Sequence, residues 1–115
     1  MILSDLHFKE NLEKILYSHD MTYPWGCLLI FISLGKFRKK PTKEMTAQVS
    51  KMIEDAKKKG IKILGFYWTL GRYDTVLIFE APNEKEAMKA GINAADFVAT
   101  ETLVAIKREE AIKLL

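Results

Sequence analysis

Two apolar, aromatic segments, residues 61–70 and 73–81, stand on either side of Gly71 and Arg72. Runs of aromatic and β-branched residues on both sides of a short glycine-containing loop are typical of a β-hairpin. Glycine at the first loop position suits a two-residue type II′ turn, in which that residue has positive φ. The pattern therefore predicts two antiparallel strands joined by a tight turn.

Apolar residues at intervals of three and four predict helices before and after this hairpin. The first covers residues 43–59, with Thr42 as N-cap and Gly60 as the residue that ends it. The second begins after Asn83, which forms a capping-box pattern with Glu86. Its inner positions are small residues that allow close packing on a sheet: Ala87, Ala90, Gly91, Ala94 and Ala95.

The remaining segments complete the order of elements. Residues 27–34 form a strand that is apolar on both faces, residues 35–41 a basic loop, residues 96–106 a last strand and residues 108–115 a short helix. Residues 5–18 form an extra N-terminal helix with one apolar stripe: Phe8, Leu12, Ile15 and Leu16. We divide the chain into a helical extension, 1–26, and one domain, 27–115.

The order strand, helix, strand, strand, helix, strand predicts an α+β, ferredoxin-like βαββαβ fold. Right-handed crossovers place both helices on one face of a four-stranded antiparallel sheet. The first strand and residues 76–79 are apolar at both odd and even positions, so apolar side chains point to both faces of the sheet. The face without helices would therefore expose a large apolar patch. We expect a second copy to cover it, in a homodimer of the dimeric α/β-barrel type. The alternative is that the N-terminal helix covers this face alone.

The two-residue turn fixes which side chains share a face. It pairs Leu64 with Phe79 and predicts a core face of Leu64, Phe66, Trp68, Leu77 and Phe79. The opposite face carries Ile63, Gly65, Tyr67, Thr69, Asp74, Val76, Ile78 and Glu80. Polar groups enclosed between two sheets are reasonable binding candidates. The candidates are Tyr67, Thr69, Arg72, Asp74 and Glu80, with Gly65 leaving room for a ligand.

Each candidate also has a structural interpretation. The Asp74 carboxylate could accept hydrogen bonds from turn amides or from Arg72, and we favour such a role for Asp74 and for Tyr73. Arg72 could bind an anion through its planar fork, or lie solvated at the hairpin tip. Glu80 and Glu101 could be simple border residues at the end of a sheet.

Composition excludes several classes of function. The net charge of +3 comes largely from residues 36–40 and 57–59, which we interpret as a solvated loop and a helix end rather than a nucleic-acid or membrane site. Cys27 is the only cysteine, and with His7 and His19 it forms no Cys/His metal-ligand pattern. We therefore expect no disulfide, metal or cofactor. With no signal-peptide pattern and no apolar run long enough to span a bilayer, we expect a cytoplasmic protein.

The segment from Tyr67 to Asp74, with Glu80-Ala81-Pro82 and Thr100-Glu101-Thr102-Leu103, closely resembles the GYD domain family. Gly71, Tyr73 and Asp74 match the motif that gives the family its name. The resemblance covers about residues 27–115 and implies a ferredoxin-like fold without a known activity. The same motifs are similar to the ligand-sensing domain of Lrp/AsnC regulators, which form face-to-face dimers and bind amino acids between subunits. Residues 1–26 are too short for a helix-turn-helix, so DNA binding is not carried over.

Three functions remain open at the level of sequence. The one we favour is a dimeric module that binds a small polar metabolite between or beside its sheets. The second is a small dimeric α/β-barrel enzyme, of the monooxygenase or isomerase kind, that uses Asp74 or Tyr67 in proton transfer. The third is a structural or adaptor protein without a ligand. An enclosed cavity would favour the first two, and a fully packed interface the third.

Overall fold

The computed structural model describes residues 28–115, so the predicted N-terminal helix and Cys27 lie outside the described residues. The described elements follow the expected order. They are β1 (Leu29–Phe37), α2 (Lys43–Lys58), β2 (Lys62–Trp68), β3 (Thr75–Ala81), α3 (Glu84–Ala94), β4 (Val98–Ala105) and α4 (Arg108–Ile112).

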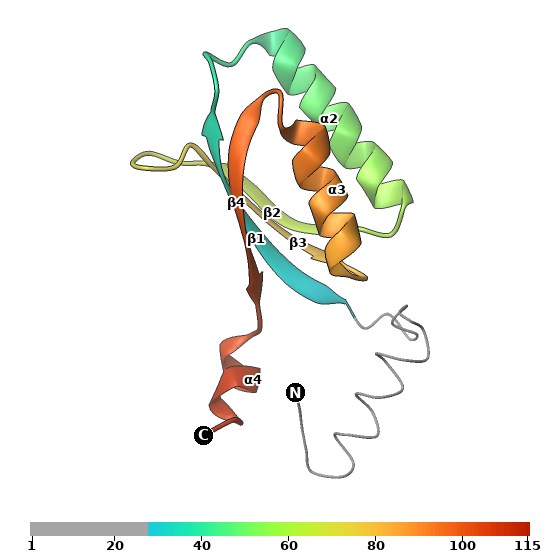
Figure 1. The fold of residues 1–115 in the computed structure, drawn as a ribbon, viewed down its shortest axis with the longest axis vertical. Helices are drawn as coiled ribbons and strands as arrows, with labels where there is room; N and C mark the ends of the chain where they lie inside the picture. The colour runs from blue at the N-terminus through green and yellow to red at the C-terminus, as the bar shows by residue number, and fades with distance from the viewer. Residues whose placement is uncertain (1–27) are drawn as a thin grey trace.

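The four strands form one antiparallel sheet in the order β2-β3-β1-β4. Helices α2 and α3 lie side by side on one face of this sheet, and α4 projects beyond the end of β4 (Figure 1). This is the ferredoxin-like α+β fold that the order of elements predicts. We call the sheet face opposite α2 and α3 the open face.

Side-chain caps position both long helices. The Thr42 hydroxyl accepts a hydrogen bond from the Met45 N–H at 3.1 Å, and the Asn83 amide oxygen accepts one from the Glu86 N–H at 3.0 Å. Gly60 follows α2 with φ +96°, a conformation that favours glycine. The Glu86 carboxylate binds Lys89 at 3.3 Å. Helix boundaries are thus set by local chemistry, as the sequence predicts.

Strand lengths differ from the expectation most clearly in β1 and in the hairpin. β1 continues to Phe37, through part of the expected basic loop, because β4 pairs with it as far as Phe37 opposite Val98. The hairpin strands instead stop at Trp68 and start at Thr75, so the connection is longer than a two-residue turn.

The hairpin register is as predicted from Trp68 opposite Thr75 to Phe66 opposite Leu77. Beyond Gly65 it shifts, so that Ile63, and not Leu64, pairs with Phe79. The predicted partner of Phe79 was therefore wrong. A bulge adds one residue to β2 and reverses the alternation of its faces. Leu64 is accordingly 45% exposed, and Ile63 packs against the core in its place.

The most buried part of the core lies between the sheet and α3. Phe31 and Phe79 are each 2% exposed, and their rings stack with centroids 5.4 Å apart. Ala81 on β3 and Ala87 on α3 complete the contact with side chains small enough for the helix to approach. Close packing is thus concentrated around the Phe31–Phe79 pair, at the end of the sheet away from the hairpin loop.

Candidate functional site

The hairpin loop is held by two hydrogen bonds at its base. The Thr69 N–H donates to the Asp74 carbonyl at 2.8 Å, and the Thr69 hydroxyl donates to the Tyr73 carbonyl at 2.7 Å. Gly71 has φ +107°, which confirms the positive φ expected there. Thr69 and Asp74 are therefore opposite each other, as predicted, and they form the base of the loop.

Asp74 joins the hairpin to β1. Its backbone N–H donates to the Gly35 carbonyl at 2.7 Å, and its carboxylate accepts a hydrogen bond from the Phe37 N–H at 2.8 Å. Both bonds continue the pairing of β1 with β3 beyond the last strand residue, Thr75. The carboxylate thus replaces a backbone acceptor at the end of the sheet, which is a structural role.

Tyr67 lies on the open face, opposite Val76 in the register, and is 57% exposed. A Cβ atom built at Gly65 would come within 2.7 Å of Tyr67 Cε2, so the tyrosine ring occupies the space beside this glycine. We expected that space to admit a ligand, and in this structure the Tyr67 ring takes it. Gly65 instead allows the Tyr67 ring to lie flat along β2.

Tyr73 reaches from the loop to β4, where its hydroxyl donates to a Glu101 carboxylate oxygen at 2.6 Å. This hydrogen bond raises the pKa of Tyr73, with smaller contributions from desolvation and from the negative charge of Glu101. The Arg72 guanidinium lies 5.7 Å from the centroid of the Tyr73 ring, and the Arg72 carbonyl accepts from Lys36 Nζ at 3.3 Å. The loop is thereby attached to both β1 and β4.

The candidates from sequence fall into two groups. Tyr67, Thr69, Arg72 and Asp74 gather at the hairpin end of the sheet. Glu80 pairs with Lys62 and Ile30 near the opposite end. Glu80 is four residues along β3 from Val76, the partner of Tyr67, which is about 13 Å in an extended chain. Glu80 therefore does not join the hairpin group.

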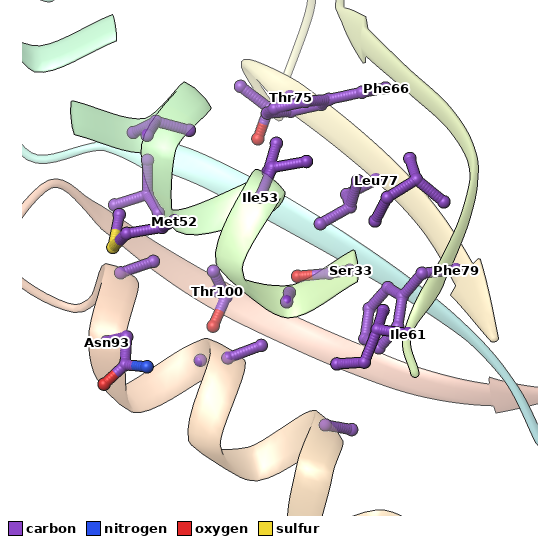
Figure 2. A pocket seen from close by; sticks show the side chains of 18 of the residues that line it. Ser33, Met52, Ile53, Ile61, Phe66, Thr75, Leu77, Phe79, Asn93 and Thr100 are labelled. Carbon is purple, nitrogen blue, oxygen red and sulfur yellow. The ribbon is translucent and has the colours of Figure 1, made fainter. Parts of the chain in front are cut away.

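A cavity of about 350 Å³ lies on the other side of the sheet, under α2 and α3. Figure 2 shows apolar side chains of both helices and of the sheet around it. None of the five candidate residues lines it. Sequence reasoning treated this region as packed core and missed the cavity. The signal that could have revealed it is a set of small hydroxyl residues at core-facing positions of the strands.

Four hydroxyl groups lie on the sheet side of this cavity, and we call them the floor hydroxyls: Ser33, Thr75, Thr100 and Thr102. Ser33 and Thr102 are opposite each other, with their oxygens 3.5 Å apart. Thr75 and Thr100 flank Gly35 on the two neighbouring strands. Because Gly35 has no side chain, the Thr75 hydroxyl can lie over its backbone.

Aromatic rings line the hairpin end of the cavity. Phe37 and Trp68 meet edge to face with centroids 5.1 Å apart, and both line the cavity. Trp68 remains 60% exposed although it lies on the helix-covered side. This end therefore offers an apolar wall that is open to solvent.

The sequence profile of the GYD domain family matches residues 31–115, from β1 through α4. The chain belongs to the GYD domain family. The matched range includes the hairpin with Gly71, Tyr73 and Asp74, and the whole of the cavity lining. A comparison with curated proteins finds no match to this sequence.

Two kinds of feature are absent from the described part of this GYD domain. Residues 28–115 contain no group of three or more His, Cys, Asp or Glu side chains placed to hold a metal ion. Over the same residues, no helix has the length and apolar character needed to cross a bilayer.

Proposed function

We propose that this GYD domain is a dimeric small-molecule-binding module, in which two copies pair through their open faces and each copy holds a ligand between its helices and its sheet. The observation that carries the proposal is the cavity of about 350 Å³ beneath α2 and α3. Its volume is within the range of small-molecule sites, and such sites combine an apolar lining with a few polar groups. The floor hydroxyls supply those polar groups here.

The dimer is supported by the character of the open face. By register, its central rows carry apolar side chains from three strands: Ile30, Ile32, Leu34, Val76, Ile78 and Leu103. Polar residues lie at its two ends, with Lys62 and Glu80 at one and Tyr67 and Glu101 at the other. An apolar centre with a polar border is the usual anatomy of a protein interface.

A second copy fits this face better than one helix does. Four strands spaced about 4.8 Å apart make a surface wider than a single helix of about 10 Å diameter covers. An identical sheet has the same width and the same apolar rows, so it matches the face under a two-fold axis. The hairpin residues Tyr67, Thr69 and Arg72 would then border the interface, where they could meet a polar ligand or the partner chain.

Binding is favoured over proton transfer by what the polar groups do. The floor of the cavity carries hydroxyls, whereas the Asp74 carboxylate is held by the Phe37 N–H at the end of the sheet. A general base must reach the proton that it removes. Asp74 is engaged in backbone pairing and does not line the cavity, so its geometry fits support of the fold.

Native mass spectrometry of freshly purified protein tests both parts of the proposal. We expect a dimer mass with a retained small molecule. Ala90→Leu on α3 should fill the cavity and remove the bound mass while the dimer persists. Met88→Leu is the matched control, because Met88 is 66% exposed on the same helix. A monomer would contradict the dimer. A ligand-free dimer that also fails to take up small aromatic probes would contradict binding in the cavity.

A further inference from the structure

Thr75 is the one buried polar residue within residues 28–115, with 7% of its surface exposed. Its side chain lines the cavity, and its hydroxyl has no hydrogen-bond partner among the described residues. A buried hydroxyl without a partner lowers stability, because folding removes its hydrogen bonds to water. Valine has the same shape and would avoid that cost. The presence of the hydroxyl therefore suggests a hydrogen-bond partner that enters the cavity.

From this position we infer the class of ligand: a neutral, mainly apolar molecule with one oxygen-bearing group that hydrogen-bonds to Thr75 Oγ1. The inference rests on the proposed binding of a small molecule in the cavity. Because a hydroxyl both donates and accepts, a carbonyl, an ether or a hydroxyl group could be the partner.

Gly35 keeps the Thr75 hydroxyl accessible. A Cβ atom built at Gly35 would collide with Thr75 Oγ1, so the oxygen leans over the bare backbone of β1. In Figure 2 the oxygen of Thr75 is turned toward the side chain of Ile53 on α2. Gly35 itself is buried, and any larger residue there would displace the Thr75 hydroxyl.

The residues around Thr75 indicate that the rest of the ligand is apolar and uncharged. Phe66 and Leu77 lie near it on the sheet, and Ile53 of α2 lies close to it (Figure 2). The charged side chains of the lining come from the helices. Glu86 and Lys89 pair with each other at 3.3 Å, and Asp55 and Lys59 are exposed. A ligand charge at the floor would have no partner, so a neutral ligand is favoured.

Three matched probes test this inference by NMR titration of the full chain: p-xylene, p-cresol and p-toluate. They share one ring and differ in a methyl, a hydroxyl and a carboxylate group. We expect p-xylene and p-cresol to shift resonances of α2 and of the floor strands. We expect p-toluate to bind at least about tenfold more weakly, because its charge loses water without gaining a partner.

Thr75→Val separates the hydroxyl from the shape of the site. It should weaken p-cresol binding by about 3- to 10-fold, the usual effect of one hydrogen bond, and leave p-xylene binding equal or stronger. It should also raise the melting temperature of the ligand-free protein. Met88→Leu is the control, because Met88 is 66% exposed on α3 and does not line the cavity. Thr75→Ser keeps the hydroxyl and should retain the p-cresol affinity of the native protein.

The outcomes distinguish this inference from the proposal beneath it. If no probe binds the folded native protein, binding in the cavity is wrong and the inference falls with it. If p-xylene binds but Thr75→Val weakens p-cresol no more than Met88→Leu does, only the inference is overturned. Tighter binding of p-toluate than of p-cresol would overturn the neutral character of the ligand. A Thr75→Val protein that melts at a lower temperature would show that the hydroxyl is satisfied within the chain, which also overturns the inference.

Discussion

The backbone N–H of Phe37 donates a hydrogen bond to the carboxylate of Asp74 at 2.8 Å, across 37 positions of the chain. This bond fixes the end of β1 beside the start of β3. It also places Phe37 where its ring meets Trp68 at the open end of the cavity. The aspartate of the GYD motif therefore shapes the cavity through the backbone, without lining it.

Removing the Asp74 carboxylate should destabilise the domain. Asp74→Ala leaves the part-buried Phe37 N–H without an acceptor, and the free energy of unfolding should fall by about 1.5–3 kcal/mol. Asp74→Asn keeps an oxygen acceptor and should lose less. Urea denaturation followed by circular dichroism measures both. Asp96→Ala, at an exposed turn, is the control; equal losses for Asp74→Ala and Asp96→Ala would contradict the bond's role.

Gly71→Val should lower the free energy of unfolding by about 1–3 kcal/mol, because a β-branched residue is strained at φ +107°. A Cβ atom at Gly71 meets nothing within 4 Å, so the cost comes from the backbone alone. Gly91→Ala on α3 is the matched control. Its new methyl group makes an ordinary contact at 3.7 Å with Thr100, and alanine should stabilise the helix by about 0.5–1 kcal/mol. Thermal melting should shift in opposite directions for the two variants.

The hydrogen bond between Tyr73 and Glu101 should make stability depend on pH in the alkaline range. The pKa of Tyr73 is raised above its usual value because the carboxylate of Glu101 accepts from the neutral phenol. Its stabilisation is therefore present below the pKa of an unfolded tyrosine, about 10, and is lost as the pH rises through the higher folded pKa. The stability difference between native protein and Tyr73→Phe should shrink over that interval. A difference that stays constant from pH 8 to 11 would contradict this bond.

A charge at the centre of the open face should prevent pairing of two copies. Ile32→Glu and Ile78→Lys lie in the same row of the sheet, and either should give a folded monomer in light scattering across a dilution series. Met88→Lys, on the exposed side of α3, should leave the dimer intact. Deleting residues 1–20 tests the alternative cover. Loss of the dimer on that deletion, with no effect of Ile32→Glu, would assign the contact to the N-terminal segment.

Much of this fold could be predicted from sequence because its determinants are local. Thr42, Gly60 and Asn83 act within a few residues of themselves, and the alternation around Gly71 identifies two paired strands. Once the order of elements was known, the handedness of crossovers left few topologies. The family motif and the positive φ of Gly71 were found in the same way.

Three features depended on contacts between distant segments. β1 extends to Phe37 because β4 and Asp74 supply partners, which no pattern within residues 35–41 records. The bulge in β2 adds one residue, so that Ile63 takes the core position expected for Leu64. The alternation of apolar and polar residues does not indicate where along a strand such an extra residue lies. The floor of the cavity is formed by residues such as Ser33, Thr75 and Thr100, which come from three strands and meet beneath α2 and α3. Sequence therefore determined the elements and their order, while tertiary packing decided where the interior is filled and where it is hollow, because volume between layers depends on side chains that are far apart along the chain.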